Sequence, residues 1–325
     1  MKIIASCLVL AVSAASGSST DIAGLHAAEP VLEAGAPERA VLITGASTGI
    51  GRSTAEYLAK NGFFVYAGAR KDKDLAELNK LDNVQGIRLD VTIPGDIEAA
   101  VETVTDAGRG LYGLINNAGV LVMAPLTEVT EADLLFQMDV NVMGPYRVTK
   151  AFADLLIESK GRVLTTGSIA GFVTWGLGGP YTMSKHAVEA YTDCLAEELE
   201  PLGVGVSVIE PGSFRSRIWT STVDRMKAKG YTAEGSRYEG ALRRFMERGG
   251  INPEQRAPLP VAKAFHAALT SPKPLRRYMV TPNQNQAEST LMATFRRIAQ
   301  LNEGHEFTYS REELHEMLDR AIGPE

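Results

Sequence analysis

Short apolar runs and amphipathic stretches alternate along the chain from about residue 39 to residue 210. The apolar runs predict six buried strands, over residues 40–44, 63–67, 84–91, 111–115, 162–166 and 205–210. Helical periodicity predicts helices between them, over residues 50–61, 74–81, 96–107, 130–158 and 180–200, the fourth with a hinge at Gly144–Pro145. Because strands that alternate with helices form parallel sheets, we expect an α/β fold with helices on both faces of the sheet.

This regular alternation ends after Pro211. Residues 213–260 show no clear period, and we expect them to form a lid over the substrate, the alternative being a disordered segment. The pattern predicts a further helix over residues 260–269 and a last strand over residues 278–280. The tail carries two helical patterns, and Ser310 opens the second in capping-box spacing. The sequence therefore predicts one Rossmann-type, doubly wound domain of about seven strands over residues 39–285, with a C-terminal helical extension over residues 286–325.

The first 38 residues do not follow the alternating pattern. Lys2 precedes an apolar run over residues 3–12 and then small residues, which resembles a secretory signal peptide. The alternative is a disordered leader ahead of the folded domain. The run is too short to cross a bilayer. Localisation therefore stays open between the cytoplasm, export and attachment to a membrane.

The composition narrows the class of function. Hydrophobic residues make up 45% and charged residues 22% of the 325 residues, as in an ordinary globular protein. The net charge of −6 gives no basic excess, which argues against a nucleic-acid partner. Cys7 and Cys194 do not have metal-binding spacing, so no metal is implied. We expect Cys194 to be a small buried residue on a helix.

A glycine-rich loop follows the first predicted strand. Gly45, Gly49 and Gly51 lie where this strand turns into a helix. Glycine permits positive φ and lets a phosphate approach the bare backbone, and the helix N-terminus offers free N–H groups to an anion. The glycines could serve only as a tight turn, but the order strand, loop, helix favours nucleotide binding.

The end of the second predicted strand bears on the choice of cofactor. A site for NAD usually has an acidic residue here to hold the ribose 2′-hydroxyl, whereas a basic residue accommodates the 2′-phosphate of NADP. Ala69 stands where the acid would be, and Arg70 follows it. The sequence therefore favours NADP(H), with Ser47 adding a hydroxyl to the phosphate site. The alternatives are NAD(H) and a purely solvated role for Arg70.

Tyr181 and Lys185 are four residues apart on a predicted helix and so share one face. A free tyrosine has a pKa of about 10 and is a poor base at neutral pH. A nearby ammonium group favours the phenolate, so we expect Lys185 to lower the tyrosine pKa. Tyr181 could then exchange a proton with an alcohol.

Together these motifs resemble those of the short-chain dehydrogenase/reductase family. The glycine spacing G-x3-G-x-G, the sequence NNAG after the fourth strand and Tyr-x3-Lys carry the resemblance, which extends over residues 41–216. Residues 181–212 are most similar to the steroid and retinol branch. The resemblance implies that Ser168 orients the substrate oxygen and that Asn141 holds a water chain to the lysine. A turn serine and a helix-kink asparagine are the alternative interpretations.

The resemblance also implies a set of cofactor contacts. It places Asp90 and Val91 at the adenine, and it brings Lys185 to the nicotinamide ribose. Residues 211–216 would meet the nicotinamide amide, with Ser216 where a threonine is usual. The candidate cofactor-binding residues are Gly45, Ser47, Thr48, Gly49, Ile50, Gly51, Arg70, Asp90, Val91, Asn117, Ala118, Gly119, Tyr181, Lys185, Pro211, Gly212, Phe214 and Ser216.

The sequence thus predicts an NAD(P)-dependent oxidoreductase that interconverts an alcohol and a ketone or aldehyde, with Tyr181 as acid and base. An apolar pocket lining favours a lipophilic substrate such as a steroid or retinol, and we expect it from residues 123–125, Phe172, Val173, Trp175, Leu177, Phe214, Ile218 and Trp219. The resemblance implies a homodimer or homotetramer through the helices over residues 130–158 and 180–200. The alternatives are a non-catalytic NADP(H) sensor and an exported scaffold protein of the same fold.

Overall fold

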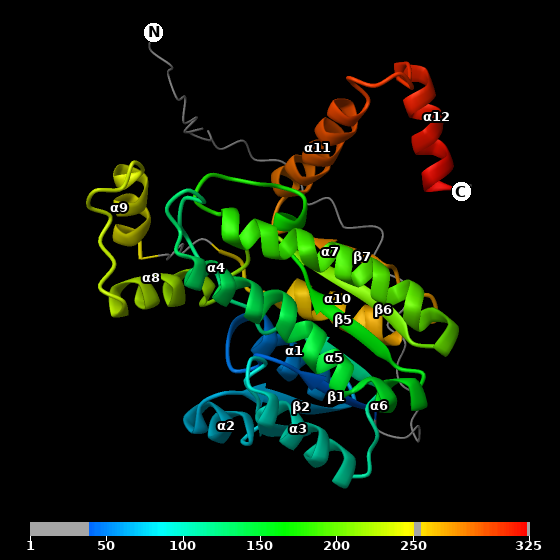
Figure 1. Cartoon of the computed structure of the whole chain (residues 1–325). Coiled ribbons are helices and arrows are strands. Elements are labelled where there is room, and N and C mark those ends of the chain that lie inside the picture. The colour runs from blue at the N-terminus through cyan, green and yellow to red at the C-terminus, as the bar shows by residue number, and fades with distance from the viewer. Residues whose placement is uncertain (1–38, 250–254, 324–325) are drawn as a thin grey trace, which may run out of the picture. The chain divides into compact units, whose positions relative to one another are not determined.

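The computed structural model describes residues 39–249 and 255–323, and the predicted leader lies outside these residues. Seven strands form one sheet in the order β3-β2-β1-β4-β5-β6-β7, and every neighbouring pair is parallel (Figure 1). The strands are β1 (Arg39–Ile43), β2 (Phe63–Ala69), β3 (Val84–Arg88), β4 (Gly113–Asn116), β5 (Arg162–Thr166), β6 (Gly205–Pro211) and β7 (Arg277–Val280). The predicted doubly wound parallel sheet is confirmed.

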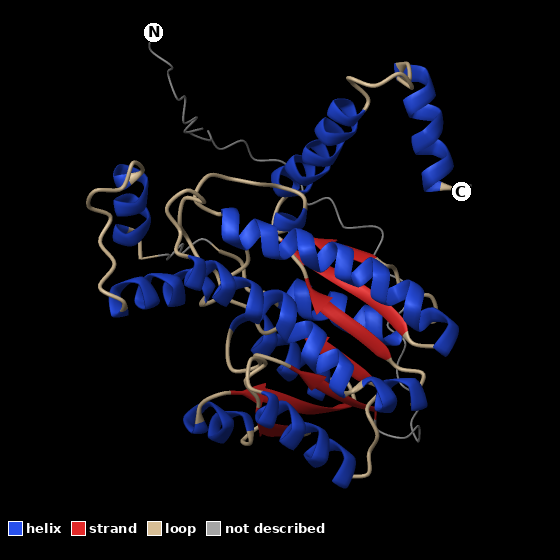
Figure 2. Cartoon of the chain, in the orientation of Figure 1, coloured by secondary structure: helices blue, strands red, loops and turns tan. Residues whose placement is uncertain are grey.

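Helices cover both faces of this sheet (Figure 2). One face carries α1 (Gly49–Lys60) and α10 (Leu259–Thr270), which pack against each other. The other carries α3 (Pro94–Asp106), α5 (Gly144–Ala151) and α7 (Gly179–Leu199). The short helices are α2 (Asp72–Leu78), α6 (Ala153–Glu158) and the 3₁₀ turns η2 (Ile169–Gly171) and η3 (Glu200–Leu202).

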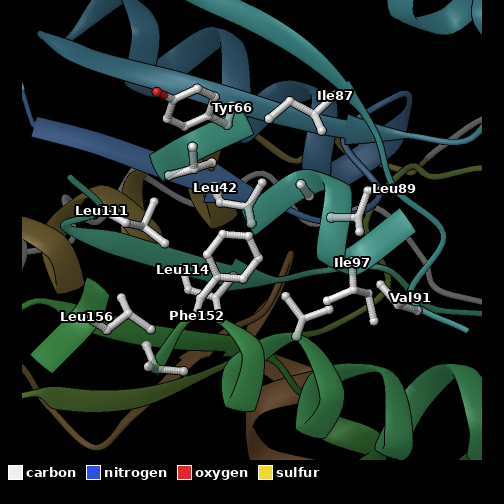
Figure 3. Packing of buried hydrophobic residues seen from close by; sticks show 14 of the residues in the cluster. Leu42, Tyr66, Ile87, Leu89, Val91, Ile97, Leu111, Leu114, Phe152 and Leu156 are labelled. Atoms are coloured by element: carbon white, nitrogen blue, oxygen red, sulfur yellow. The ribbon is translucent and has the colours of Figure 1, made fainter. Parts of the chain in front are cut away.

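The apolar faces of the central strands and of the covering helices meet in a buried core (Figure 3). Leu42 of β1, Tyr66 of β2 and Leu114 of β4 are fully buried, and Phe152 packs into the same cluster from the segment after α5. Burying one large apolar side chain contributes about 1.5–3 kcal/mol. The core therefore fixes the strands whose carboxyl ends carry the candidate site.

The helix predicted over residues 130–158 is interrupted at the predicted hinge, but it is divided further than expected. It is divided into α4 (Glu131–Met138), a π-helical turn η1 (Asp139–Met143), α5 and α6. Thr130 caps α4, since its hydroxyl accepts from the Asp133 N–H at 3.1 Å. The break falls next to Gly144 and Pro145, and a proline inside a helix has no N–H for the carbonyl four residues earlier.

The segment predicted as a lid contains two helices, α8 (Ile218–Ala228) and α9 (Glu239–Glu247). The predicted extension is formed by α11 (Gln284–Leu301) and α12 (Arg311–Ile322), and Ser310 with Glu313 makes the expected capping box. Within the two described ranges, no helix is both long and apolar enough to cross a membrane. Cys194 is exposed, so its predicted burial is wrong.

Candidate active site

The order of the sheet reverses between β1 and β4, and the loops after these two strands are bound to each other. The Thr44 hydroxyl accepts hydrogen bonds from the backbone N–H groups of Asn117 and Ala118, both at 2.9 Å. The Asn117 side chain in turn donates to the carbonyls of Thr44 and Gly45, at 3.0 and 3.1 Å. A reversal of strand order in such a sheet is where nucleotides bind.

The glycine loop is shaped by contacts that exclude side chains. Gly45 and Gly49 adopt φ of +66° and +60°, a backbone region that residues other than glycine rarely adopt. A methyl group on Gly51 would overlap the Asn117 side-chain nitrogen and the carbonyl oxygen of Gly45. These glycines therefore leave bare backbone at the start of α1, a cradle that fits the pyrophosphate of a dinucleotide.

Gly51→Ala should weaken this cradle. The added methyl group has to push apart the Gly45 and Asn117 segments, and overpacking of this kind costs about 1–3 kcal/mol of unfolding free energy. We expect at least tenfold weaker binding of NADPH, measured by nicotinamide fluorescence, together with a lower Tm. Gly95→Ala is the control, because a methyl group on Gly95 meets nothing within 4 Å. Equal NADPH affinity in both variants would contradict the cradle.

A cavity of about 900 Å³ opens at the carboxyl ends of the strands. All of the candidate cofactor-binding residues and all four candidate catalytic residues line it. Among the expected apolar residues, Val173, Trp175, Phe214, Ile218 and Trp219 also line it.

Other parts of the expected lining do not reach the cavity. Phe172, Leu177 and residues 123–125 are absent from its described wall. The loops that carry Leu177 and Ala124 pair with each other instead, through a backbone hydrogen bond of 2.9 Å. The wall also contains residues that sequence reasoning did not name, among them Phe136 of α4, Asp224 and Arg225 of α8 and Gln286 of α11.

Ser168 lies just after β5, where it caps the turn η2. Its hydroxyl accepts from the Ala170 N–H at 3.1 Å and lies 3.4 Å from the carbonyl oxygen of Pro211. The same hydroxyl hydrogen-bonds to Tyr181. The structure thus places the serine and tyrosine hydroxyls side by side at the cavity wall.

Lys185 lies one turn after Tyr181 on α7 and is buried. Its ammonium nitrogen donates to the Thr166 carbonyl at 2.7 Å and lies 5.7 Å from the centre of the Tyr181 ring. Burial lowers the pKa of Lys185 to about 8, although the charge of Glu189 opposes this fall. The lysine is thereby held beside the tyrosine by the strand end that precedes Ser168.

The expected fall in the tyrosine pKa is wrong for the chain by itself. Burial raises the pKa of Tyr181 to about 12, against a smaller opposite effect of the hydrogen bond to Ser168. Desolvation favours the neutral phenol over the charged phenolate. Tyr181 therefore carries its proton at neutral pH.

Asn141 lies in the π-helical turn η1 and holds the loop after β4. Its side chain accepts from the Val120 N–H at 2.8 Å and donates to the Val120 carbonyl at 3.0 Å and the Ser184 hydroxyl at 3.1 Å. These partners occupy the amide of Asn141. The backbone carbonyl of Asn141 is the one that Pro145 deprives of an α-helical donor.

Residues 39–227 match the family model described as short chain dehydrogenase. The chain belongs to the short-chain dehydrogenase family. The match covers the sheet through β6, the glycine loop and the Tyr181–Lys185 helix, so family membership and the described site rest on the same residues.

Named relatives in the short-chain dehydrogenase family include mammalian enzymes. The mitochondrial D-beta-hydroxybutyrate dehydrogenase of Rattus norvegicus is 39% identical over 201 residues, which are 58% of this chain and 58% of that protein. The chain thus spans less than two thirds of that relative. The 17-beta-hydroxysteroid dehydrogenase type 6 of Homo sapiens is 34% identical over 255 residues, 74% of this chain and 80% of that protein.

A solved member of the short-chain dehydrogenase family has a similar fold. The enzyme of Burkholderia phymatum, whose structure is a complex with NAD, superposes with a TM-score of 0.71 at 25% identity. The superposition covers 84% of this chain and 98% of that one.

At the far end of the cavity, Arg70 faces Asp90. The guanidinium lies 3.5 Å from the Asp90 carboxylate, and 63% of the arginine side chain is exposed. Burial acts to raise the pKa of Asp90, but hydrogen bonds from Thr92 and the charge of Arg70 outweigh it and hold the pKa below its usual value. In this member of the short-chain dehydrogenase family, the ionised Asp90 carboxylate therefore attracts the Arg70 guanidinium at the cavity wall.

Proposed function

We propose that this chain is an NAD(P)-dependent oxidoreductase that interconverts an alcohol and a ketone or aldehyde. The observation that carries the proposal is the convergence of Ser168, Tyr181 and Lys185 on one cavity whose other end is a glycine cradle. The dehydrogenases named among the relatives support it. When bound, the nicotinamide cofactor supplies or accepts the hydride.

The protein's own contribution is proton transfer and orientation. Ser168 holds the substrate oxygen next to the Tyr181 hydroxyl, to which it is already hydrogen-bonded. Because the raised pKa keeps Tyr181 protonated, the tyrosine is ready to donate a proton to a carbonyl oxygen as negative charge develops there. Lys185, fixed by the Thr166 carbonyl, then stabilises the phenolate that remains. In the opposite direction the same groups accept the alcohol proton.

We further propose a lipophilic substrate. The cavity wall contains Phe136, Val173, Trp175 and Trp219, and the Trp175 ring lies 6.1 Å from the Tyr181 ring. Such a lining gains free energy by burying apolar surface of a ligand. One of the relatives is named as a hydroxysteroid dehydrogenase, and a steroid is a lipophilic substrate.

The proposed function is tested by the oxidation of NADPH in the presence of steroid, retinoid and short aliphatic ketones and aldehydes. Turnover should be highest with the lipophilic compounds. Turnover only with small polar carbonyls would reject the substrate class. Absence of turnover across the whole panel would reject the oxidoreductase.

Arg70→Ala should remove the preference for NADPH. We expect at least tenfold weaker binding of NADPH, equal to about 1.4 kcal/mol, because the 2′-phosphate loses its cation. Binding of NADH should stay within twofold. Fluorescence titration with each nucleotide measures this, and Lys73→Ala, an exposed cation of α2 outside the cavity wall, is the control. A parallel loss for both nucleotides would exclude a specific phosphate contact.

The predicted homodimer or homotetramer remains a proposal. Four large apolar side chains are exposed on the helices named for it: Leu135 on α4, Met143 at the end of η1, Tyr146 on α5 and Met183 on α7. Exposed apolar side chains that gather on neighbouring helices favour burial in an interface.

A further inference from the structure

A group of buried charged side chains lies behind the catalytic loop and takes no part in the mechanism above. Glu189 follows Lys185 by one turn on α7, Glu210 lies near the end of β6, and Arg277 begins β7. Both glutamates are buried. The Arg277 Nε atom lies 3.2 Å from Glu189 and 3.5 Å from Glu210, and its Nη2 atom lies 2.7 Å from Asp193.

Each of the two glutamates has one buried oxygen that accepts no hydrogen bond. Oε1 of Glu189 and Oε1 of Glu210 are both buried without a hydrogen-bond partner, and the nearest cation to the second of them is the Arg277 Nε atom at 3.5 Å. The two carboxyl groups nevertheless hydrogen-bond to each other, with Glu210 as donor. A hydrogen bond between two carboxyl groups requires a proton on one of them. Ionising both would also place two like charges in contact away from water.

The carboxyl group of Glu189 also packs against the backbone on both sides of Ser168. A methyl group on Gly167 would lie 3.1 Å from Glu189 Oε1, and one on Gly171 would lie 2.8 Å from the same atom. Both positions are glycine, which lets the catalytic loop rest directly on this oxygen. One turn earlier on the same helix, Lys185 holds the loop through the Thr166 carbonyl.

We propose that Glu189 and Glu210 share one proton and, held by Arg277, act as positioning residues that support the Ser168 loop and fix the charge beside Lys185. The proposal rests on the proposed oxidoreductase function for its catalytic consequence. The charged groups that face the pair are Lys185 and Asp193 of α7 and Arg277 of β7. With one proton, the pair carries a single negative charge next to the positive charges of Lys185 and Arg277, and Asp193 also pairs with Arg276 at 3.8 Å.

The pKa shifts set the pH range in which this arrangement acts. Burial, together with the neighbouring Glu189, raises the pKa of Glu210 from 4.5 to about 8. The folded protein therefore keeps a proton that the unfolded chain releases above about pH 4.5. The associated stability is full below that pH and is lost as the pH rises to about 8.

Proton sharing is tested without any use of catalysis. The amide of Glu210→Gln donates to Glu189 at every pH, as the protonated acid does only below about pH 8. The Tm of the unmodified protein should fall relative to that of Glu210→Gln between about pH 5 and about pH 8. Parallel Tm curves over this range would overturn the shared proton, whether or not the protein proves to be an oxidoreductase.

The positioning role is tested by the pH profile of kcat. Glu189→Gln removes the charge that keeps Lys185 protonated, so the alkaline loss of activity should move down by about one pH unit. Glu197→Gln, an exposed site on the same helix, removes an equal charge and should leave the profile in place. Superimposable profiles for Glu189→Gln and the unmodified protein would overturn the role.

Glu210→Gln supplies a second test in case Glu189→Gln does not fold. It retains the Glu189 charge but lacks the second charge that the pair gains above about pH 8. The pH at which Glu210→Gln loses activity on the alkaline side should therefore lie between the values for the unmodified protein and for Glu189→Gln. If Glu189→Gln cannot be measured, this pH should lie below that of the unmodified protein. Loss of activity at the same pH as in the unmodified protein, or at a higher pH, would reject the positioning role.

Discussion

Tyr181→Phe should lower kcat by about 10²–10⁴-fold. The substitution deletes the hydroxyl that exchanges a proton with the substrate oxygen and that now hydrogen-bonds to Ser168. The ring itself stays in place beside Trp175, so NADPH affinity should stay within twofold. Steady-state reduction of a lipophilic ketone measures the first effect, and fluorescence titration measures the second.

The same helix offers a matched control. Burial raises the pKa of Tyr191, as of Tyr181, to about 12, but the Tyr191 hydroxyl lies 3.4 Å from the Pro145 carbonyl and outside the cavity wall. Tyr191→Phe removes an equally buried phenol hydroxyl and should leave kcat within threefold. A similar loss of kcat in both variants would show that disturbed packing of α7, and not proton transfer, explains the effect.

Ser168→Ala should lower kcat by about 10²–10³-fold, the cost of removing one well-placed donor to a developing oxygen charge. The variant also removes the hydrogen bond that opposes the rise in the Tyr181 pKa. In the direction of alcohol oxidation, which needs the deprotonated tyrosine, the activity should therefore shift to higher pH. Initial rates at several pH values measure both effects.

Ser207→Ala separates this effect from a loss of stability. Ser207 is buried on β6 and donates to the Leu275 carbonyl at 2.6 Å, away from the cavity wall. Its removal should cost about 1 kcal/mol of unfolding free energy with no change in kcat. An unchanged kcat in Ser168→Ala would remove the serine from the mechanism.

The strands, most helices and the glycine cradle could be predicted because each depends on a pattern within a few neighbouring residues. An apolar run marks β1, and the glycines that follow it mark the cradle. The Tyr181–Lys185 pair could be found for the same reason, since one helical turn separates the two side chains. Family resemblance added Ser168, whose function depends on a segment distant in sequence.

The features that sequence reasoning missed depend on contacts between distant segments. The turn η1 is fixed by Asn141 and Gln137, which bind the backbone of the loop at Val120 and Val122. Gln286 enters the cavity wall because it accepts from the Ser213 N–H at 2.8 Å, an interaction between α11 and the loop after β6. No local pattern contains either contact.

Burial explains the error in the tyrosine pKa. The sequence shows that an ammonium group lies one turn away, but it does not show how much water either group loses on folding. In the structure, desolvation dominates both shifts, so the pKa of Tyr181 rises and that of Lys185 falls. The buried pair Glu189 and Glu210 could not be predicted either, because α7 and β6 are brought together only by folding.

Transfer of an isotopic label tests the central proposal most directly. The unmodified protein and Tyr181→Phe would each be incubated with NADPH deuterated at the transferring position of C4 and with a lipophilic ketone, and the alcohol product analysed by mass spectrometry. We expect deuterium at the carbinol carbon with the unmodified protein and at least a hundredfold slower labelling with Tyr181→Phe. Tight binding of NADPH without label in any product, or equal labelling by both proteins, would contradict an oxidoreductase that uses Tyr181 as its acid and base.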